Sequence, residues 1–381
     1  MTVSAPERLR CMVLATWYPS DADPVDGVFV REGVRAIARR CDVAVLHAAP
    51  ESGRMPGIRS DRVENGLRTV RVGFPPLPTA QASLPLRLLA LGTGYRRLVA
   101  HGFRPDVIHA HVYLSGFAGE VIGRGRVPVV ISEHLSSFVT GTIGRPQRAL
   151  ARRAYESADL VCPVSDDLGR RLAAIAPRAR LRTVPNPVDT DRFCPGRRAD
   201  GGPRIVAVAR LHERKGIDHL LRAFARVRER RATAELAIAG DGPERPALEA
   251  LAADLHLNGA ARFLGLRDHA AVAELMRGAD LLVLPSLAEN LPTVVLEAHA
   301  CGLPVVATDV GGTREALDPS AGRLVEAGDE EALAAAIVAV LAVDHDREAV
   351  SARAHERYGY DAVAERWEAT YRELLATRER D

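Results

Sequence analysis

Residues 281–308 read LLVLPSLAENLPTVVLEAHACGLPVVAT, and this stretch decides the fold. The apolar run 281–285 predicts a buried strand, and Pro292 suits the first turn of a helix that follows it. A turn at residues 302–304 then leads into a second apolar run at 305–308. A strand, a helix and a strand in this order are typical of a βαβ unit, whose two strands lie parallel in one sheet.

The same alternation of short β-branched runs and longer segments of helical period extends along the whole chain. It recurs without a sequence repeat and predicts an α/β protein with parallel sheets. In such sheets, ligands bind beyond the carboxyl ends of the strands. The expected strands are 11–16, 43–48, 69–74, 107–111, 127–132, 160–165 and 182–185 in the first half, and 204–210, 235–239, 261–264, 281–285, 305–308 and 322–325 in the second.

The length of 381 residues exceeds what one hydrophobic core usually organises, which predicts two domains. Residues 186–203 are rich in Pro, Gly, Asp and Arg and follow neither period, so we expect the linker there. The expected domains are therefore 1–189 and 190–359. A helix at about 360–378 is expected to pack back on the first domain.

Composition favours a cytoplasmic protein. No run approaches the roughly 18 apolar residues of a membrane span, and residues 1–10 lack the apolar segment of a signal peptide. The five cysteines are an odd number at wide spacings, which favours reduced buried thiols over disulfides or a zinc site.

Charge divides the chain into a basic and an acidic half. Residues 1–190 hold 26 arginines and 17 acidic residues, a net charge of +9, and the remainder carries −7. The simpler interpretation is that the solvated surfaces of the two halves merely differ in charge. The more specific interpretation is that the first half binds an anionic partner. The basic segments 145–153 and 170–182 lack the aromatic interleaving of nucleic-acid-binding proteins, so no nucleic acid is expected. A peripheral contact with anionic lipid at the inner face of the membrane remains an alternative.

Two carboxylates follow the strand 281–285. Glu289 lies in the loop before the expected helix, and Glu297 lies about one and a half turns into it. The helix N-terminus between them offers N–H groups that suit a diphosphate. Two acceptor groups that bracket a diphosphate suit a sugar and a ribose, although solvated acids at this spacing also arise by chance.

Two cations follow the strand 204–210. Arg210 ends this strand, and Lys215 opens the next expected helix. Lys215 is the only lysine among 51 basic residues, which suggests that a compact ammonium is needed there. Two fixed cations at a strand end can neutralise a diphosphate and stabilise the charge of a departing nucleotide.

The Glu-x7-Glu and Arg-x4-Lys patterns, in this order and context, resemble those of glycosyltransferase family 4. The resemblance is strongest from 204 to 315 and implies the GT-B architecture, two Rossmann-like domains that face a deep cleft. It assigns the donor sugar to Glu289, the nucleotide ribose to Glu297 and the diphosphate to Arg210 and Lys215. The other donor-side residues that it implies are Gly240, Asp241, Leu264, Asn290, Leu291 and Thr293.

In the first half, the resemblance covers the loop after the first strand. Gly27 precedes a helix and would let backbone N–H groups approach the donor or the acceptor, although a single glycine replaces the family's more usual pair. Tyr18 in the same loop is an expected acceptor-side residue. The sequence 21–23, Asp-Ala-Asp, superficially matches a metal-binding Asp-x-Asp, but we interpret it as turn residues and expect no metal site.

Histidines end two strands of the first half. Strand alternation places His109 and His111 on one face, where a shared metal is conceivable, but no further ligand stands beside them at metal-site spacing. A lone histidine is usually structural, yet His111 matches the family position that contacts the donor sugar near the reacting carbon. Glu133 and His134 resemble a Glu-His pair that lines the acceptor side in part of the family.

The resemblance implies a retaining hexosyltransferase that uses neither a metal nor a cofactor. Its co-substrate would be a nucleotide-diphosphate sugar, with UDP or GDP favoured, and its acceptor a hydroxyl group of a small metabolite, a glycan or a lipid-linked glycan. The catalytic residues would be His111, Arg210, Lys215 and Glu289. The alternatives are a nucleotide-sugar epimerase or a phosphorylase on the same fold, or a catalytically silent sugar-nucleotide-binding protein. The Arg- and Ala-rich composition suggests a bacterial gene of high GC content.

Overall fold

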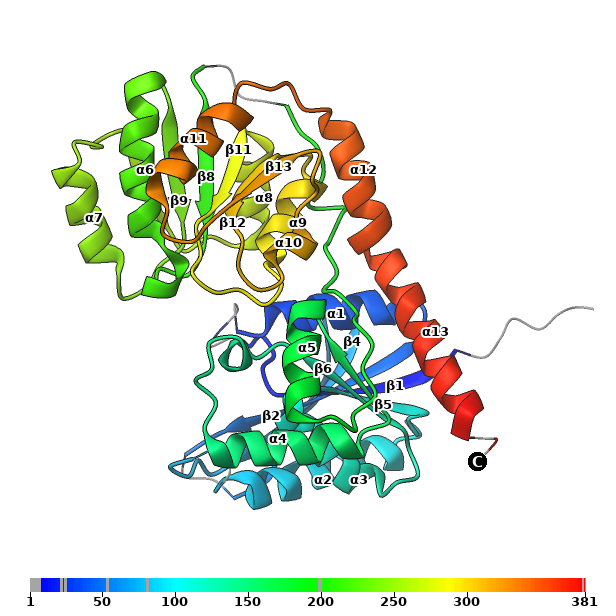
Figure 1. Cartoon of the computed structure of the whole chain (residues 1–381). Helices are drawn as coiled ribbons and strands as arrows, with labels where there is room; N and C mark the ends of the chain where they lie inside the picture. Colours follow the sequence, from blue (N-terminus) through cyan, green and yellow to red (C-terminus); the bar gives the residue numbers. More distant parts are fainter. Residues whose placement is uncertain are drawn as a thin grey trace, which may run out of the picture. The chain divides into compact units, whose positions relative to one another are not determined.

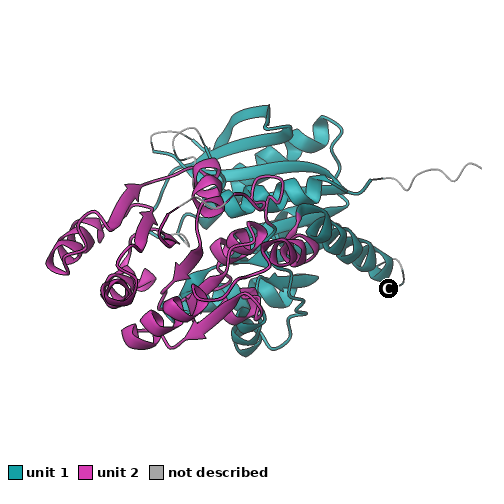
Figure 2. Cartoon of the chain, turned by 90° about the horizontal axis from the view of Figure 1, so that it is seen from above, with its two compact units in different colours: residues 1–187, 360–381 teal, residues 188–359 magenta. Residues whose placement is uncertain are grey.

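The computed structural model describes residues 8–20, 23, 26–52, 55–79, 82–197, 201–378 and 380. The chain forms two compact units, which Figure 2 shows in different colours. Unit 1 comprises residues 1–187 and 360–381, and unit 2 comprises residues 188–359. The division falls two residues before the expected boundary, and the last helix groups with unit 1.

Unit 1 is built on a seven-stranded sheet in the order β3-β4-β2-β1-β5-β6-β7 (Figure 1). β3 is antiparallel to β4, and the other neighbours are parallel. The strands are β1 (Arg10–Ala15), β2 (Asp42–Pro50), β3 (Gly57–Glu64), β4 (Leu67–Phe74), β5 (Val107–His111), β6 (Val129–Glu133) and β7 (Leu160–Pro163). The helices are α1 (Val28–Ala38), α2 (Leu84–Ala100), α3 (Val112–Gly123), α4 (Arg145–Ser157), α5 (Asp166–Ile175) and α13 (Tyr360–Arg378).

The C-terminal helix α13 is part of the core of unit 1. Its residues Val363, Trp367, Tyr371 and Leu374 recur every three or four positions, so they share one face of the helix. All four are buried in one cluster with side chains of β1 and α1. The last helix of the chain therefore packs against the first strand.

Unit 2 has a six-stranded sheet, entirely parallel, in the order β10-β9-β8-β11-β12-β13. The strands are β8 (Arg204–Val208), β9 (Glu235–Ala239), β10 (Ala261–Gly265), β11 (Leu281–Leu284), β12 (Val305–Thr308) and β13 (Gly322–Val325). The helices are α6 (Ile217–Arg230), α7 (Arg245–Asp254), α8 (His269–Arg277), α9 (Thr293–Ala300), α10 (Thr313–Ala316), α11 (Glu330–Val340) and α12 (Arg347–Tyr358). The stretch 281–308 forms β11, α9 and β12, as its pattern predicts.

Two strand predictions were wrong. Residues 182–185 form no strand, and Leu181 makes only an isolated bridge to Val161. The edge strand β3 was missed because most of its side chains are polar and only partly buried. The turn into β4 contains Asn65 and Gly66, both with positive φ, and this Asn-Gly pair is the signal that could have revealed the hairpin.

Two helix starts also differ from expectation. Lys215 does not open α6: it lies in a 3-10 turn (Glu213–Lys215), and α6 begins two residues later at Ile217. Pro292 lies at the N-cap of α9, just before its first turn.

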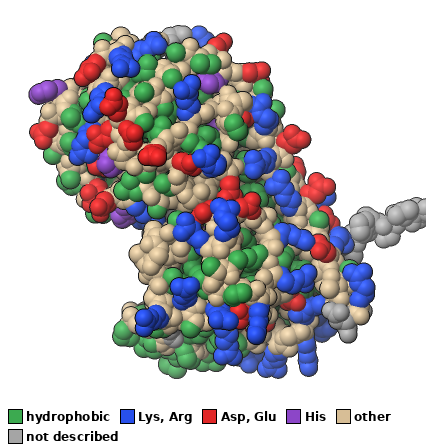
Figure 3. All heavy atoms as spheres, in the orientation of Figure 1, with side chains coloured by type: hydrophobic (Ala, Val, Ile, Leu, Met, Phe, Trp, Pro, Cys, Tyr) green, Lys and Arg blue, Asp and Glu red, His purple; other side chains and the backbone are tan. Residues whose placement is uncertain are grey.

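The charge difference between the halves is visible on the surface. In the face shown in Figure 3, Lys and Arg side chains outnumber acidic ones over unit 1, whereas both kinds mix over unit 2. Exposed arginines of unit 1 include Arg145, Arg148, Arg152 and Arg153 on α4. All five cysteines are free thiols. Within the described ranges, no helix is long and apolar enough to cross a membrane.

Candidate active site

In unit 2, an ion pair joins the loops that follow β8 and β11. Nζ of Lys215 lies 2.5 Å from Oε1 of Glu289, and the two side chains are only 17% and 12% exposed. The N–H of Leu287 also donates to the carbonyl oxygen of Arg214 at 2.8 Å. The two strands are neighbours in the sheet, so their loops meet at its carboxyl edge.

The loop after β12 packs directly on Glu289. Gly311 has a φ of 52°, and a Cβ at this position would lie 1.8 Å from the carbonyl oxygen of Glu289. A side chain cannot fit there without moving the loop. The absence of a side chain at Gly311 thus lets this loop pack against the backbone of Glu289.

Helix α9 begins immediately after the loop that follows β11 and carries Glu289. The N–H of Val295 donates to the carbonyl oxygen of Pro292, whereas those of Thr293 and Val294 precede the first helical hydrogen bond and can receive an anion. Glu297 is half-buried in the second turn. The expected donor-side residues Asn290, Leu291 and Thr293 lie in the loop and at the first position of this helix.

Arg210 and Asp241 also lie just beyond strand ends. Arg210 is exposed, and its side chain makes no hydrogen bond or ion pair with a described residue. Asp241 follows β9, and its pKa is lowered by the N–H of Gly242 and by Arg245, whose Nη1 lies 3.0 Å away. The N–H of Gly240 donates to the carbonyl oxygen of Gly265 and joins the ends of β9 and β10.

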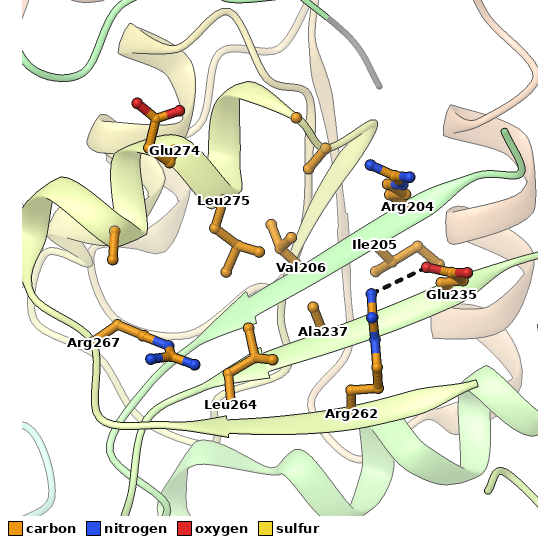
Figure 4. Close-up of a pocket in the computed structure, with 13 residues that line it drawn as sticks. Arg204, Ile205, Val206, Glu235, Ala237, Arg262, Leu264, Arg267, Glu274 and Leu275 are labelled. Carbon is orange, nitrogen blue, oxygen red and sulfur yellow. Dashed lines mark hydrogen bonds and ion pairs between the residues drawn. The ribbon is translucent and has the colours of Figure 1, made fainter. Parts of the chain in front are cut away.

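Leu264 lines a pocket of about 330 Å³ on the face of the same sheet. Figure 4 shows its walls, which come from β8, β9, β10 and α8, and the ion pair of Arg262 with Glu235 at 3.2 Å. Arg204 and Glu235 are the first residues of their strands, so much of this pocket runs towards the amino edge of the sheet. The pocket therefore does not coincide with the Lys215–Glu289 ion pair, and neither residue lines it.

Three histidine rings form a stack in unit 1. The ring centroids of His109 and His111 lie 4.9 Å apart, and those of His111 and His134 lie 5.2 Å apart, with interplanar angles of 11° and 12°. The expected placement of His109 and His111 on one face is thus confirmed. Nδ1 of His111 lies 3.1 Å from Nε2 of His134. His109 and His111 are buried, and His134 is half-buried.

The stacked histidines are neutral at pH 7. Burial lowers the pKa of His109 and of His134 to about 3, and it lowers the pKa of His111 well below its ordinary value. Nε2 of His111 is buried and has no hydrogen-bond partner among the described residues. A neutral imidazole with one unused nitrogen can bind a hydroxyl group.

Glu133 organises the backbone around this stack. Its buried carboxylate accepts hydrogen bonds from the N–H groups of Tyr113, His134 and Leu135, and from the hydroxyl of Tyr155 on α4. Burial raises the pKa of Glu133, and these donors oppose that shift. The carboxylate shapes the carboxyl edge of the sheet, and both of its oxygens are already engaged.

The loop after β1 depends on a glycine. Gly27 is the N-cap of α1 with a φ of 69°, and a Cβ there would lie 2.4 Å from the carbonyl carbon of Trp17. Tyr18 is buried beneath the guanidinium of Arg71, and burial raises its pKa to about 12. Of the Asp-Ala-Asp sequence, residues 21 and 22 lie outside the described residues. Across the described chain, no group of three or more His, Cys, Asp or Glu side chains could hold a metal ion.

Sequence reasoning missed the supports of this edge. Tyr371 contacts His109, and the buried Arg87 donates to the hydroxyls of Thr16 and Ser115. An arginine in the otherwise apolar start of α2 was the available signal for the second contact. No local sequence pattern predicts the contact between Tyr371 and His109, because these residues are 262 positions apart.

Comparison with known proteins covers both units. A "Glycosyl transferase 4-like domain" model matches residues 27–187, and a "Glycosyl transferases group 1" model matches residues 202–343. D-inositol 3-phosphate glycosyltransferase of Corynebacterium jeikeium is 30% identical over 386 aligned positions, which cover 91% of each chain.

Solved structures agree with this fold. Sucrose-phosphate synthase from Thermosynechococcus elongatus superposes with a TM-score of 0.77 at 22% identity and covers 97% of this chain and 100% of its own. Anabaena HepE in complex with UDP and glucose gives a TM-score of 0.73 at 19% identity, over 95% and 99% of the two chains. The chain belongs to glycosyltransferase family 4 and is a glycosyltransferase with the GT-B fold.

Proposed function

We propose that the enzyme moves a sugar from a nucleotide-diphosphate sugar to a hydroxyl group of an acceptor and retains the configuration at the anomeric carbon. The ion pair of Lys215 and Glu289, 2.5 Å apart, carries the proposal. In this pair an ammonium and a carboxylate lie side by side at the carboxyl edge of unit 2, next to the N-terminus of α9. A diphosphate that binds there finds the ammonium, the exposed Arg210 and free N–H groups together.

In this proposal, unit 2 binds the donor. Arg210, Lys215 and the N-terminus of α9 hold the diphosphate, Glu289 accepts a hydrogen bond from the sugar, and Glu297 accepts one from the ribose. The remaining donor contacts of unit 2 are assigned to Gly240, Asp241, Leu264, Asn290, Leu291 and Thr293, and one further donor contact is assigned to Gly27 of unit 1. Unit 1 binds the acceptor, with Tyr18 and His134 on that side and His111 at the donor sugar.

The proposed reaction is a front-face displacement. The bond between the anomeric carbon and the diphosphate oxygen breaks, and the acceptor oxygen bonds to the same face of that carbon. The hydroxyl proton passes to the departing diphosphate oxygen. Arg210 and Lys215 hold the developing negative charge, so the scheme needs neither a protein nucleophile nor a metal ion.

UDP is the nucleotide that we propose first, because the structure of Anabaena HepE contains UDP and glucose. For the acceptor, the name of the Corynebacterium relative makes a phosphorylated cyclic polyol the first compound to test. The enzyme would then act in the cytoplasm or at the inner face of the membrane.

The test is a thermal-shift and hydrolysis screen with UDP-, GDP-, ADP- and dTDP-glucose. Ligand at 100 times its Kd stabilises the native state by about 2.7 kcal/mol. One nucleotide should raise the melting temperature of the wild type and of Glu356→Ala, a control at an exposed position of α12, but not that of Glu297→Ala. The absence of any shift in the wild type would refute the donor site. An anomeric NMR analysis of the product tests retention.

A further inference from the structure

Unit 1 contains a pocket of about 190 Å³ at the carboxyl ends of β1, β5 and β6. Its lining includes Val112 and Leu135, which directly follow His111 and His134 in the chain. Pockets for drug-sized ligands span about 300–1,000 Å³, so this smaller one suits a single ring. It lies in the unit to which the proposed function assigns the acceptor.

The walls of this pocket are held rigidly. Tyr113, Leu135 and helix α4 are tied to one another through the buried carboxylate of Glu133, which accepts from two of their N–H groups and from the hydroxyl of Tyr155. Val112 has a φ of 64°, which is strained for a β-branched residue. Strain of this kind persists only where the surrounding contacts over-determine the backbone, as at ligand sites. The pocket is therefore preformed.

The lining is uncharged. Trp17, Tyr113, Leu135 and Ile143 supply apolar surface, and Ser137 and Gln147 supply neutral hydrogen-bonding groups. Among the described residues that line the pocket, none is Lys, Arg, Asp or Glu. The carboxamide of Gln147 lies against Gly144, the N-cap residue of α4.

One cation lies behind this wall. The guanidinium of Arg87 donates to the hydroxyl of Thr16, a lining residue, and to that of Ser115. Its side chain is buried and is not part of the lining, so the hydroxyl of Thr16 stands between the charge and the pocket. A phosphate in the pocket would find no cationic partner among the lining residues, and an anion without such a partner is costly to desolvate.

We propose that this pocket selects an acceptor whose bound part is an uncharged ring, such as a neutral pyranose, and rejects phosphorylated polyols. The inference rests on the proposed function, but it excludes the phosphorylated polyol that the name of the Corynebacterium relative suggests. Trp17 and Tyr113 offer flat apolar surface to the C–H face of the ring, while Ser137 and Gln147 exchange hydrogen bonds with its hydroxyl groups. The specificity would therefore come from residues that carry no charge.

The experiment compares matched acceptors that differ only in a phosphate. Methyl α-glucoside and myo-inositol are assayed against their phosphate esters, with release of the nucleotide and formation of the product as readouts. The neutral member of a pair should have a kcat/KM about tenfold or more above that of its ester, because the ester would bury an unpaired charge. A wild type that prefers the esters would overturn the inference.

Two variants locate the selection. Gln147→Lys places a cation in the lining and should reduce the preference for the neutral acceptor by roughly tenfold, as expected for one charge-assisted contact. Ala149→Lys adds the same charge at an exposed position of the same helix, outside the lining, and should leave the preference unchanged. Equal shifts in both variants would contradict a role for the pocket.

The donor screen separates this inference from the proposed function. If UDP-sugar binding depends on Glu297 but the esters are preferred, only the acceptor inference fails. If no nucleotide sugar binds or is hydrolysed, the proposed function itself fails.

Discussion

Nδ1 of His109 lies 2.6 Å from the hydroxyl oxygen of Tyr371, a residue of the C-terminal helix 262 positions later in the chain. Nε2 of the same ring lies 2.7 Å from Oγ of Ser132. His109 is therefore held at both nitrogens, and His111 stacks on it at 4.9 Å. The last helix thus fixes the ring on which the histidine at the end of β5 rests.

Removal of the Tyr371 hydroxyl should disturb this stack. Tyr371→Phe leaves Nδ1 of His109 buried without its partner, so we expect a loss of about 1–3 kcal/mol in the free energy of unfolding. The ring ¹⁵N shifts of His109 should change as well, because the hydrogen bond selects its tautomer. Urea unfolding and NMR provide the two measurements.

Tyr358→Phe is the matched control for that change. The hydroxyl of Tyr358 donates to the carbonyl oxygen of Glu315 at 3.1 Å within unit 2. Both variants remove a tyrosine hydroxyl that makes a hydrogen bond, and the Tyr371 hydroxyl also contacts Sγ of Cys11 at 3.8 Å. Only Tyr371→Phe should move the histidine signals. Unchanged signals in Tyr371→Phe would show that the hydroxyl does not set the tautomer.

The ion pair of Lys215 and Glu289 should separate stability from activity. Either single alanine variant leaves a nearly buried charge alone, at an expected cost of about 1–3 kcal/mol in the free energy of unfolding. The double variant removes both charges and should cost less than the sum of the two. Transfer should nevertheless fall by roughly 10²–10³-fold in all three, since a charge-stabilising contact is lost.

An exposed pair gives the comparison. Arg262 and Glu235 lie 3.2 Å apart with side chains 58% and 46% exposed, so either alanine variant should change stability by less than about 1 kcal/mol. A double-variant cycle measured by urea unfolding checks both pairs. Additive costs at Lys215 and Glu289 would mean that the two charges are not coupled.

Local pattern was sufficient for much of the fold. The stretch 281–308 contains its own period, its helix-start proline and its glycine turn, and it forms β11, α9 and β12. The placement of His109 and His111 on one face followed from strand alternation alone. These features depend on residues that are close in the sequence.

The supports of the site depend on residues that are far apart. The partner of Lys215 lies 74 positions away, and Glu133 collects donors from three different elements. Such contacts follow from how helices and strands pack, which no local period specifies. The mostly polar β3 was missed for a related reason, because its pairing with β4 replaces the apolar pattern on which the prediction relied.

Acid should destabilise the protein through its buried histidines. Burial lowers the pKa of His47, His109 and His134 to about 3 and that of His299 to about 4, whereas the unfolded value is about 6.5. Below pH 6.5 the unfolded chain therefore binds more protons than the folded one. The stability that these neutral rings contribute is present above pH 6.5 and is lost as the pH falls towards the folded values.

Between pH 6.5 and pH 5.5, each of these histidines should cost about 1 kcal/mol of unfolding free energy. Urea titrations across this range measure the slope. His299→Gln removes one buried ring and should flatten the dependence, whereas His355→Gln at an exposed position should not. A slope that does not differ between the two variants would assign the acid sensitivity to other groups.

Gly311 should prove essential for the position of Glu289. In Gly311→Ala, the new Cβ meets the Glu289 carbonyl oxygen at 1.8 Å, so the loop that carries this carboxylate must move. Gly66→Ala is the matched control, because its φ of 81° is also positive but nothing lies within 4 Å of the added carbon. The control bears only the backbone cost of about 1 kcal/mol.

The clash at Gly311 adds to that cost and should weaken the binding of the donor by tenfold or more, on the order of the 1.4 kcal/mol that corresponds to a tenfold change. Calorimetric titration with the nucleotide sugar measures the difference, and equal affinities in the two variants would show that Glu289 does not need its present position to bind the donor.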